Sequence, residues 1–193
     1  MNKRDIINFF DKLACGWDKD QIIDEDIISK ILDMAKIKEN STVLDVACGT
    51  GVLFPYYLDK KVKKIFGIDI SKNMTEIAKE KFSNENIEIK CGDALEYDFN
   101  EKFDNIMIYN AFPHFPEPEK LISKLSDLLK PEGTLTVAHS MSKKELDALH
   151  MASAGSVSLL LPEVEELAKM FSINLKVTST ISNNSMYLVT GKK

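Results

Sequence analysis

The chain has 193 residues, a net charge of −5 and ordinary apolar and charged contents, which is typical of one domain with a single core. The acidic balance argues against a nucleic-acid partner, because phosphate-binding surfaces usually carry an excess of lysine and arginine. No apolar run reaches the roughly 20 residues that span a membrane, and the start MNKRDIINFF lacks a signal peptide's apolar segment. Three cysteines without CxxC spacing indicate reduced thiols in a cytoplasmic protein.

Apolar periodicity predicts alternating helices and strands. Two amphipathic helices, over 6–13 and 23–35, come before the first strand. Further helices are expected around 52–60 and over 119–130. Another is expected over 71–82, with Ser71 as its N-cap. Two more are expected to begin at a capping box formed by Ser142 and Glu145, and after Pro162. The strands are expected over 42–46, 64–70, 87–91, 103–109, 134–139 and, as a closing hairpin, 173–181 and 185–191.

This order of elements decides the fold class. Strands that alternate with helices form parallel βαβ units with right-handed crossovers. A terminal hairpin added to such a sheet leaves one antiparallel strand. The sequence therefore predicts an open α/β sandwich of about seven strands.

The segment VLDVACGTG (43–51) takes the first predicted strand into a glycine loop. A P-loop is excluded because no lysine follows Gly51. The dinucleotide fingerprint GxGxxG is incomplete, because Phe54 stands where the third glycine belongs. Asp45, four residues before Gly49, would repel a pyrophosphate and would suit a cationic group, directly or through water.

Two further acids end the next two predicted strands. Asp69 stands where a carboxylate can accept both hydroxyls of an adenosine ribose, although NAD would satisfy that position as well. Asp93 could accept the exocyclic amine of adenine while Ala94 supplies a backbone donor. The combination of Asp45, the glycine loop, Asp69 and Asp93 is more specific than any one of its members.

The blocks VLDVACGTG, GIDIS, GDALEYDF, FDNIMIYNAFPHF and LLKPEGTLTVAH resemble the class I S-adenosylmethionine-dependent methyltransferases, in that family's order and spacing. The resemblance covers almost the whole chain. It implies a Rossmann-like three-layer sandwich whose mostly parallel sheet has the order 3-2-1-4-5-7-6, with strand 7 antiparallel. It also implies one methyltransferase domain over 1–193, with an N-terminal helical cover over 1–40 and the Rossmann-like core over 41–193.

Carried over by position, the resemblance implies a site for S-adenosylmethionine, with S-adenosylhomocysteine as product. The matching positions would surround its methionine part, ribose, adenine and methyl group; they are Asp45, Ala47, Cys48, Gly49, Gly51, Asp69, Ile70, Met74, Gly92, Asp93, Ala94, Asn110 and Ala111. The stretch 9–18 resembles the segment that folds across the cofactor in methyltransferases of the quinone-modifying type. Phe10 and Trp17 are therefore candidates to close the site, with ordinary core contacts as the alternative.

Histidines are the candidates for acid–base chemistry. Methyl transfer requires alignment of the acceptor, exclusion of water and removal of a proton where one must leave. His114 and His139 follow predicted strands four and five, and imidazole titrates near neutral pH. Each could instead cap a turn.

The sequence predicts a small and partly apolar acceptor. NAFP (110–113) departs from the (D/N)PP(F/Y) pattern of enzymes that methylate amino groups of nucleic acids. The cysteines, Cys15, Cys48 and Cys91, could bind arsenite, but compact apolar packing suits them better and no metal is expected. A non-catalytic S-adenosylmethionine-binding sensor or partner protein is the alternative function. A nicotinamide-dependent oxidoreductase is disfavoured by Asp45 and Phe54.

Overall fold

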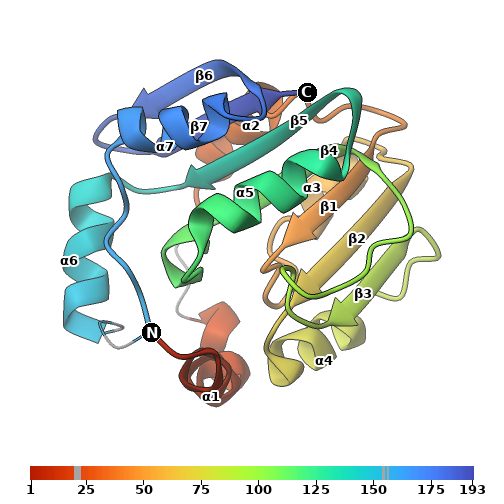
Figure 1. Ribbon diagram of the computed structural model, residues 1–193. Coiled ribbons are helices and arrows are strands. Elements are labelled where there is room, and N and C mark those ends of the chain that lie inside the picture. The colour runs from red at the N-terminus through yellow and green to blue at the C-terminus, as the bar shows by residue number, and fades with distance from the viewer. Residues whose placement is uncertain (20–22, 154, 156) are drawn as a thin grey trace.

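The alternation of strands and helices produces one seven-stranded sheet with helices on both faces, as the computed structural model shows (Figure 1). The structure describes residues 1–19, 23–153, 155 and 157–193. The helical elements are α1 (Lys3–Leu13), η1 (Ala14–Lys19), α2 (Glu25–Met34), α3 (Phe54–Asp59), α4 (Lys72–Lys81), η2 (Phe112–His114), α5 (Pro118–Asp127), α6 (Lys143–Ser153) and α7 (Val164–Ser172). The strands are β1 (Thr42–Val46), β2 (Lys64–Asp69), β3 (Ile87–Cys91), β4 (Phe103–Tyr109), β5 (Leu129–His139), β6 (Lys176–Ser182) and β7 (Tyr187–Lys192).

The strand order is β3-β2-β1-β4-β5-β7-β6. β1 runs parallel to β2 and β4, and β7 runs antiparallel to β5 and β6. The predicted order and the antiparallel seventh strand are therefore confirmed. Because the first five strands are all parallel, their carboxyl ends lie along one edge of the sheet.

Local signals set most helix starts. The Ser71 Oγ accepts a hydrogen bond from the Met74 amide at 3.1 Å, which confirms the predicted N-cap. Ser142 and Glu145 form the predicted capping box, with Ser142 Oγ 2.7 Å from a Glu145 carboxylate oxygen. α2 starts later than its apolar pattern does, because the Asp24 side chain accepts a hydrogen bond from the Ile27 amide and caps the helix there.

The largest error in a predicted boundary concerns the start of β5. The helix expected over 119–130 ends at Asp127, and β5 begins at Leu129 instead of Thr134. Leu129 pairs with Phe103 of β4 before the KPEG turn and a register shift. That pairing joins residues distant in the sequence, so the local helical pattern could not reveal it.

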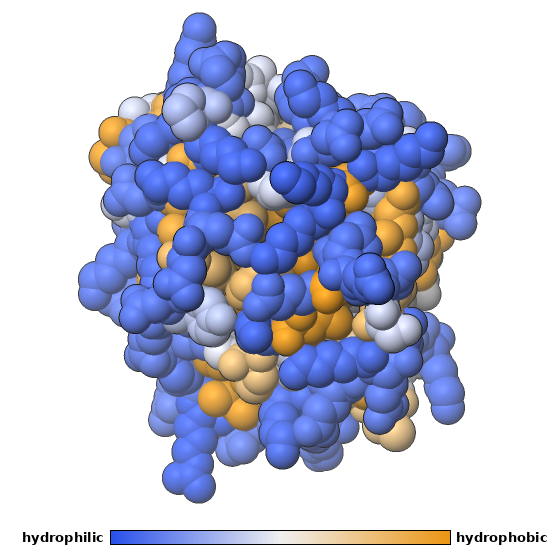
Figure 2. Space-filling view, turned by 90° about the vertical axis from the view of Figure 1, so that its right-hand side faces the viewer, coloured by the Kyte–Doolittle hydropathy of each residue, from blue (hydrophilic) through white to orange (hydrophobic). Residues whose placement is uncertain are grey.

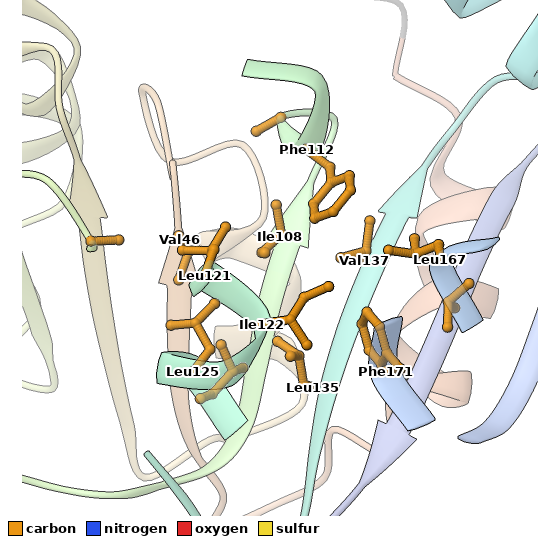
Figure 3. Packing of buried hydrophobic residues seen from close by; sticks show 14 of the residues in the cluster. Val46, Ile108, Phe112, Leu121, Ile122, Leu125, Leu135, Val137, Leu167 and Phe171 are labelled. Carbon is orange, nitrogen blue, oxygen red and sulfur yellow. The ribbon is translucent and has the colours of Figure 1, made fainter. Parts of the chain in front are cut away.

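The core has two layers, one on each face of the sheet. On one face, side chains of α5 and α7 pack against β4 and β5; Figure 3 shows Leu121, Ile122, Leu125, Leu167, Phe171, Ile108, Leu135 and Val137 among them. On the other face, α2, α3 and α4 pack against residues such as Val43 and Ile65. Since side chains alternate along a strand, Asp45 shares the face of Val43 and lies opposite Leu44 and Val46.

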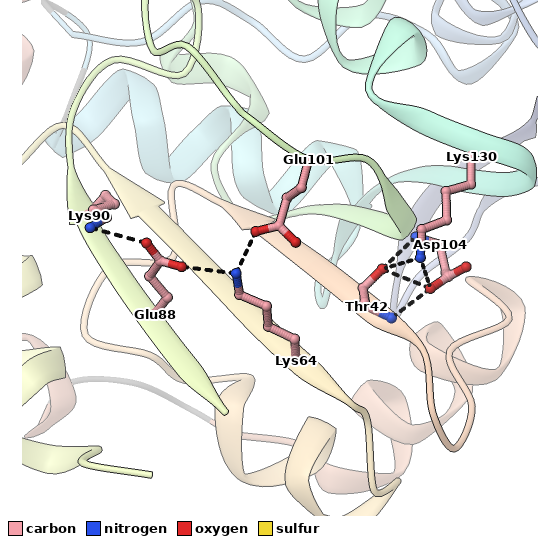
Figure 4. A network of polar contacts seen from close by, with 7 residues as sticks. All are labelled: Thr42, Lys64, Glu88, Lys90, Glu101, Asp104 and Lys130. Atoms are coloured by element: carbon pink, nitrogen blue, oxygen red, sulfur yellow. Dashed lines mark hydrogen bonds and ion pairs between the residues drawn. The ribbon is translucent and has the colours of Figure 1, made fainter. Parts of the chain in front are cut away.

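Polar contacts tie the amino ends of the strands together. Thr42 and Lys130 both bind the Asp104 carboxylate, and Lys64 bridges Glu88 and Glu101 (Figure 4). The side of the molecule with edge strand β3 is largely hydrophilic, with small apolar areas between the charged groups (Figure 2). Charged side chains on an exposed edge discourage pairing with other chains. No helix within the described ranges is long and apolar enough to cross a membrane.

Candidate functional site

The carboxyl ends of the parallel strands open into a cavity of about 1010 Å³. Ligands of open α/β sheets bind at this edge. The cavity is at the upper end of the size range that holds a drug-sized ligand, so it has room for a cofactor and a second small molecule. α1 lies beside α4 below the carboxyl ends of the strands (Figure 1), and its residues Lys3, Ile6 and Phe10 line the cavity.

The two glycines after β1 have different roles. Both have left-handed backbones, with φ of +55° at Gly49 and +86° at Gly51. A Cβ at Gly51 would lie 2.8 Å from Phe82 and 2.9 Å from Phe54, so close packing and the turn both require glycine there. A Cβ at Gly49 would meet only Trp17, at 3.9 Å. Gly49 lines the cavity and Gly51 does not.

Asp69 fastens the glycine loop to the end of β2. One carboxylate oxygen accepts a hydrogen bond from the Gly49 amide and the other from the Ser71 amide, both at 2.8 Å. Burial raises the pKa of Asp69 to about 6, against the lowering effect of these two bonds. The side chain lines the cavity, so its remaining lone pairs can accept hydrogen bonds from a ligand.

Asp45 lies behind the loop. Its side chain is only 2 % exposed and is not part of the cavity lining. Burial, opposed by the neighbouring Tyr57 hydroxyl and supported by the nearby Asp69 carboxyl, raises the pKa of Asp45 to about 8. Direct contact between Asp45 and a ligand, one of the two routes expected from the sequence, is thus not available in this arrangement.

Asp45→Asn is expected to change how the stability of the ligand-free protein depends on pH. Unfolded Asp45 ionises near pH 4, whereas the folded carboxyl keeps its proton up to about pH 8. Unfolding therefore releases a proton within this window, and stability falls as pH rises through it, by up to about 1.4 kcal/mol per pH unit. The asparagine variant should lose this slope in urea unfolding measured at pH 5 and pH 7.5.

The control for this measurement is Asp59→Asn, which removes an exposed carboxyl at the end of α3. It should keep the wild-type slope. Equal slopes for the wild type and Asp45→Asn would contradict the assignment of the proton to Asp45.

Polar contacts hold the N-terminal helices over the cavity. The Asp11 carboxylate accepts hydrogen bonds from Ser71 Oγ at 2.6 Å and from the Asn73 amide at 3.1 Å. Lys3 lies 2.6 Å from the Asp93 carboxylate. Further along, Asp18 contacts Thr50 Oγ1 and Lys81. These contacts place Phe10 and Trp17 in the cavity lining with their rings 5.7 Å apart.

The two candidate histidines occupy different environments. His114 lines the cavity, stacks edge-on against Phe10 and places Nδ1 2.9 Å from the Val157 carbonyl. Since a carbonyl can only accept, Nδ1 of the neutral ring carries the proton and Nε2 is the basic nitrogen. His139 is fully buried, packs against Tyr187 and does not line the cavity.

Hydrogen bonds join the residues that follow β4 and β5, Asn110 and Ser140. Asn110 has a left-handed backbone, with φ of +53°. Its Oδ1 accepts a hydrogen bond from the Ser140 amide at 3.0 Å, and its Nδ2 donates to Ser140 Oγ at 3.2 Å. Tyr109 lines the cavity next to this pair.

The residues expected at the cofactor site converge on this cavity, apart from Asp45 and Gly51; those in the lining are Phe10, Trp17, Ala47, Cys48, Gly49, Asp69, Ile70, Met74, Gly92, Asp93, Ala94, Asn110 and Ala111. Their roles toward a ligand stay predictions. Sequence reasoning missed Tyr109, Ser140, Lys3, Asp24 and Glu145 in the lining. The first two flank predicted strand ends and could have been found there. The other three lie on helices that only the tertiary structure brings to the site.

The chain is similar in sequence to known methyltransferases. Residues 43–133 match the family model described as a methyltransferase domain. An uncharacterized methyltransferase of Schizosaccharomyces pombe is 34% identical, over 63% of this chain and 47% of its own. A malonyl-[acyl-carrier protein] O-methyltransferase of Acetivibrio thermocellus is 30% identical, over 70% of this chain and 49% of its own. The chain thus spans about half the length of these two curated relatives.

A solved structure of the same fold is the N-methyltransferase NodS from Bradyrhizobium japonicum in complex with S-adenosyl-L-homocysteine. It superposes with a TM-score of 0.76 at 13% sequence identity, covering 99% of this chain and 97% of NodS. At that identity the likeness concerns the fold. It agrees with the sheet order described above.

Proposed function

Because the chain belongs to the class I S-adenosylmethionine-dependent methyltransferases, we propose that it transfers a methyl group to a small, partly apolar acceptor. S-adenosylmethionine is the cofactor of this family and, when bound, supplies a methyl carbon activated by the adjacent sulfonium charge. The main support is one cavity that contains the glycine loop, Asp69 and an apolar second part. The three cysteine thiols suit a cytoplasmic location, where they would stay reduced.

The cavity residues fit this cofactor better than they fit a dinucleotide. The Asp69 carboxylate accepts its two hydrogen bonds from backbone amides, and further donors such as ribose hydroxyls would complete its coordination. Asp93 also lines the cavity, and the lysine beside it, Lys3, is already paired with Asp93 and Glu96. A pyrophosphate would therefore meet carboxylates, whereas a sulfonium and an amino group would be attracted.

In this proposal the chain does three things besides binding. α1 and η1, held by the Asp11 and Asp18 contacts, exclude water from the cavity. Asn110 and Ser140 fix the end of β4 and so position the floor of the site. His114 Nε2 accepts a proton where the acceptor must lose one.

The proposed function is tested in two steps. Calorimetric titration should show binding of S-adenosylmethionine and S-adenosylhomocysteine and no comparable binding of NAD. A panel of quinols, phenols, thiols and amines should then give S-adenosylhomocysteine with at least one acceptor. Failure to bind either adenosyl compound would sink the proposal. Binding without turnover on any acceptor would favour the non-catalytic sensor.

His114→Asn is expected to lower kcat by about 100-fold with little change in S-adenosylhomocysteine affinity. Asparagine can still donate to the Val157 carbonyl, so the local backbone contact is kept while the base is lost. Steady-state kinetics with the best panel acceptor measures the effect. An unchanged kcat would remove His114 from the reaction.

A further inference from the structure

The cavity extends past the cofactor positions into a second part, here called the acceptor lobe and defined by Ile23, Asp24, Ile27, Tyr109, Glu145 and Leu149. These residues come from the start of α2, the end of β4 and α6. The carboxyl ends of β4 and β5 lie beside each other in the register Tyr109 to Ala138, and the β6–β7 turn adds Asn184 and Ser185 to the lining. The lobe is thus built by elements other than those around Asp69 and Asp93.

The walls of the acceptor lobe are apolar at its mouth. Ile23 and Leu149 line the cavity and are each 50% exposed. Ile27, Met141 and Leu146 extend the apolar lining inward. Apolar side chains that stay exposed at a cavity entrance suit the apolar body of a ligand.

The charges of the acceptor lobe all have one sign. Asp24 and Glu145 carry its carboxylates, and each is held by a helix cap: Asp24 by the Ile27 amide and Glu145 by Ser142. The six described residues that define the lobe include no lysine or arginine. An anionic acceptor would meet two like charges here without a compensating cation.

The two lysines that line the whole cavity are Lys3 and Lys120, and both are engaged in ion pairs. Lys3 binds Asp93 and Glu96, and Lys120 binds Glu117 at the start of α5. Burial and the Asp24 charge raise the pKa of Tyr109, whose neutral hydroxyl can then donate and accept hydrogen bonds at the inner end of the lobe.

From this arrangement we propose, on the basis of the methyl-transfer function above, that the acceptor is an amine with an apolar body. The lobe attracts the ammonium form, which gives one proton to water before reaction. The neutral nitrogen then forms a bond to the methyl carbon while the carbon–sulfur bond breaks and leaves its electron pair on sulfur. The methylated ammonium gives a second proton to water, so one ammonium ion and one S-adenosylmethionine give one neutral methylamine, one S-adenosylhomocysteine and two protons.

The test measures binding as well as turnover. Protein saturated with S-adenosylhomocysteine is titrated calorimetrically with phenethylamine, phenethyl alcohol and phenylacetate, which share one apolar body. Phenethylamine should bind at least about tenfold more tightly than phenylacetate, with the alcohol between them. The same order should appear in the rate of S-adenosylhomocysteine formation from S-adenosylmethionine.

A double variant tests the two carboxylates. Asp24→Asn and Glu145→Gln both keep side chains that can cap a helix, so folding should be preserved. The variant should reduce the preference for the amine to less than about threefold. The matched control, Glu39→Gln with Glu80→Gln, removes two exposed carboxyls outside the cavity and should keep the wild-type preference.

The outcomes separate this inference from the function on which it rests. The amine assignment is overturned if phenylacetate binds as tightly as phenethylamine, or if no probe binds. In either case, intact binding of S-adenosylhomocysteine would still agree with the proposed methyl transfer. An amine preference that the double variant retains would also overturn it. Loss of all adenosyl binding in the wild type would overturn the proposed function and this inference with it.

Discussion

Asp69→Ala is expected to weaken S-adenosylhomocysteine binding by about 2 to 4 kcal/mol, which is roughly 30- to 700-fold in Kd. In the proposed binding mode the carboxylate accepts the ribose hydroxyls, and in the structure it lines the cavity and holds the Gly49 and Ser71 amides. The substitution removes the ligand bonds and frees the glycine loop from the end of β2. Calorimetric titration of the purified variant measures the change.

The same substitution will lower stability, because two amides lose a buried acceptor at a cost of about 1 to 3 kcal/mol. Asp104→Ala separates the two effects. It breaks the contacts of Asp104 with Thr42 and Lys130 at the opposite edge of the sheet and leaves the cavity intact. This control should be destabilised yet bind S-adenosylhomocysteine normally. Unchanged affinity in Asp69→Ala would refute the ribose assignment.

Gly51→Ala is expected to lower the free energy of unfolding by about 3 kcal/mol. An alanine there must adopt the left-handed backbone, and its Cβ would press on Phe82 and Phe54 at 2.8 and 2.9 Å. Both rings are held in the layer between the sheet and the helices α3 and α4, so neither can move cheaply. Urea unfolding monitored by circular dichroism measures the loss.

Gly49→Ala is the matched comparison. Its backbone strain is similar, but the nearest atom to the new Cβ is Trp17 Nε1 at 3.9 Å, so the expected loss of stability is only about 1 kcal/mol. The added methyl group lies at the cavity wall and should weaken S-adenosylhomocysteine binding by about tenfold or more. If Gly51→Ala is no less stable than Gly49→Ala, the packing role assigned to Gly51 is wrong.

Gly49 and Gly51 show which part of the site could be predicted from the sequence. The GxG pattern located the loop, and the structure confirms that it follows β1 at the carboxyl edge of the sheet. The pattern could not distinguish a glycine facing a ligand from one required by packing. That distinction depends on Phe82, whose ring reaches Gly51 from the end of α4, 31 positions further along the chain.

Asp45 is a second residue whose position in the site could not be predicted from the sequence. Its place before the glycines led us to expect a carboxyl suited to a cationic group of a ligand. The side chain is buried and does not line the cavity, because strand alternation places it on the face covered by α2 and α3. The sequence shows which residues alternate, and only the packed helices show which face is covered and how deeply.

The sequence by itself determined the order of strands and helices, the glycine loop and the acids at successive strand ends, and through these the resemblance to a methyltransferase family. Periodicity and capping are local, acting over a few residues, so they can be read along the chain. Only the tertiary structure places α1 beside the cavity, held by the contacts of Lys3 and Asp11. It also brings Asp24 and Glu145, from α2 and α6, into the lining of the same cavity. These contacts join residues 60 or more positions apart, as between Asp11 and Ser71, and no local pattern encodes them.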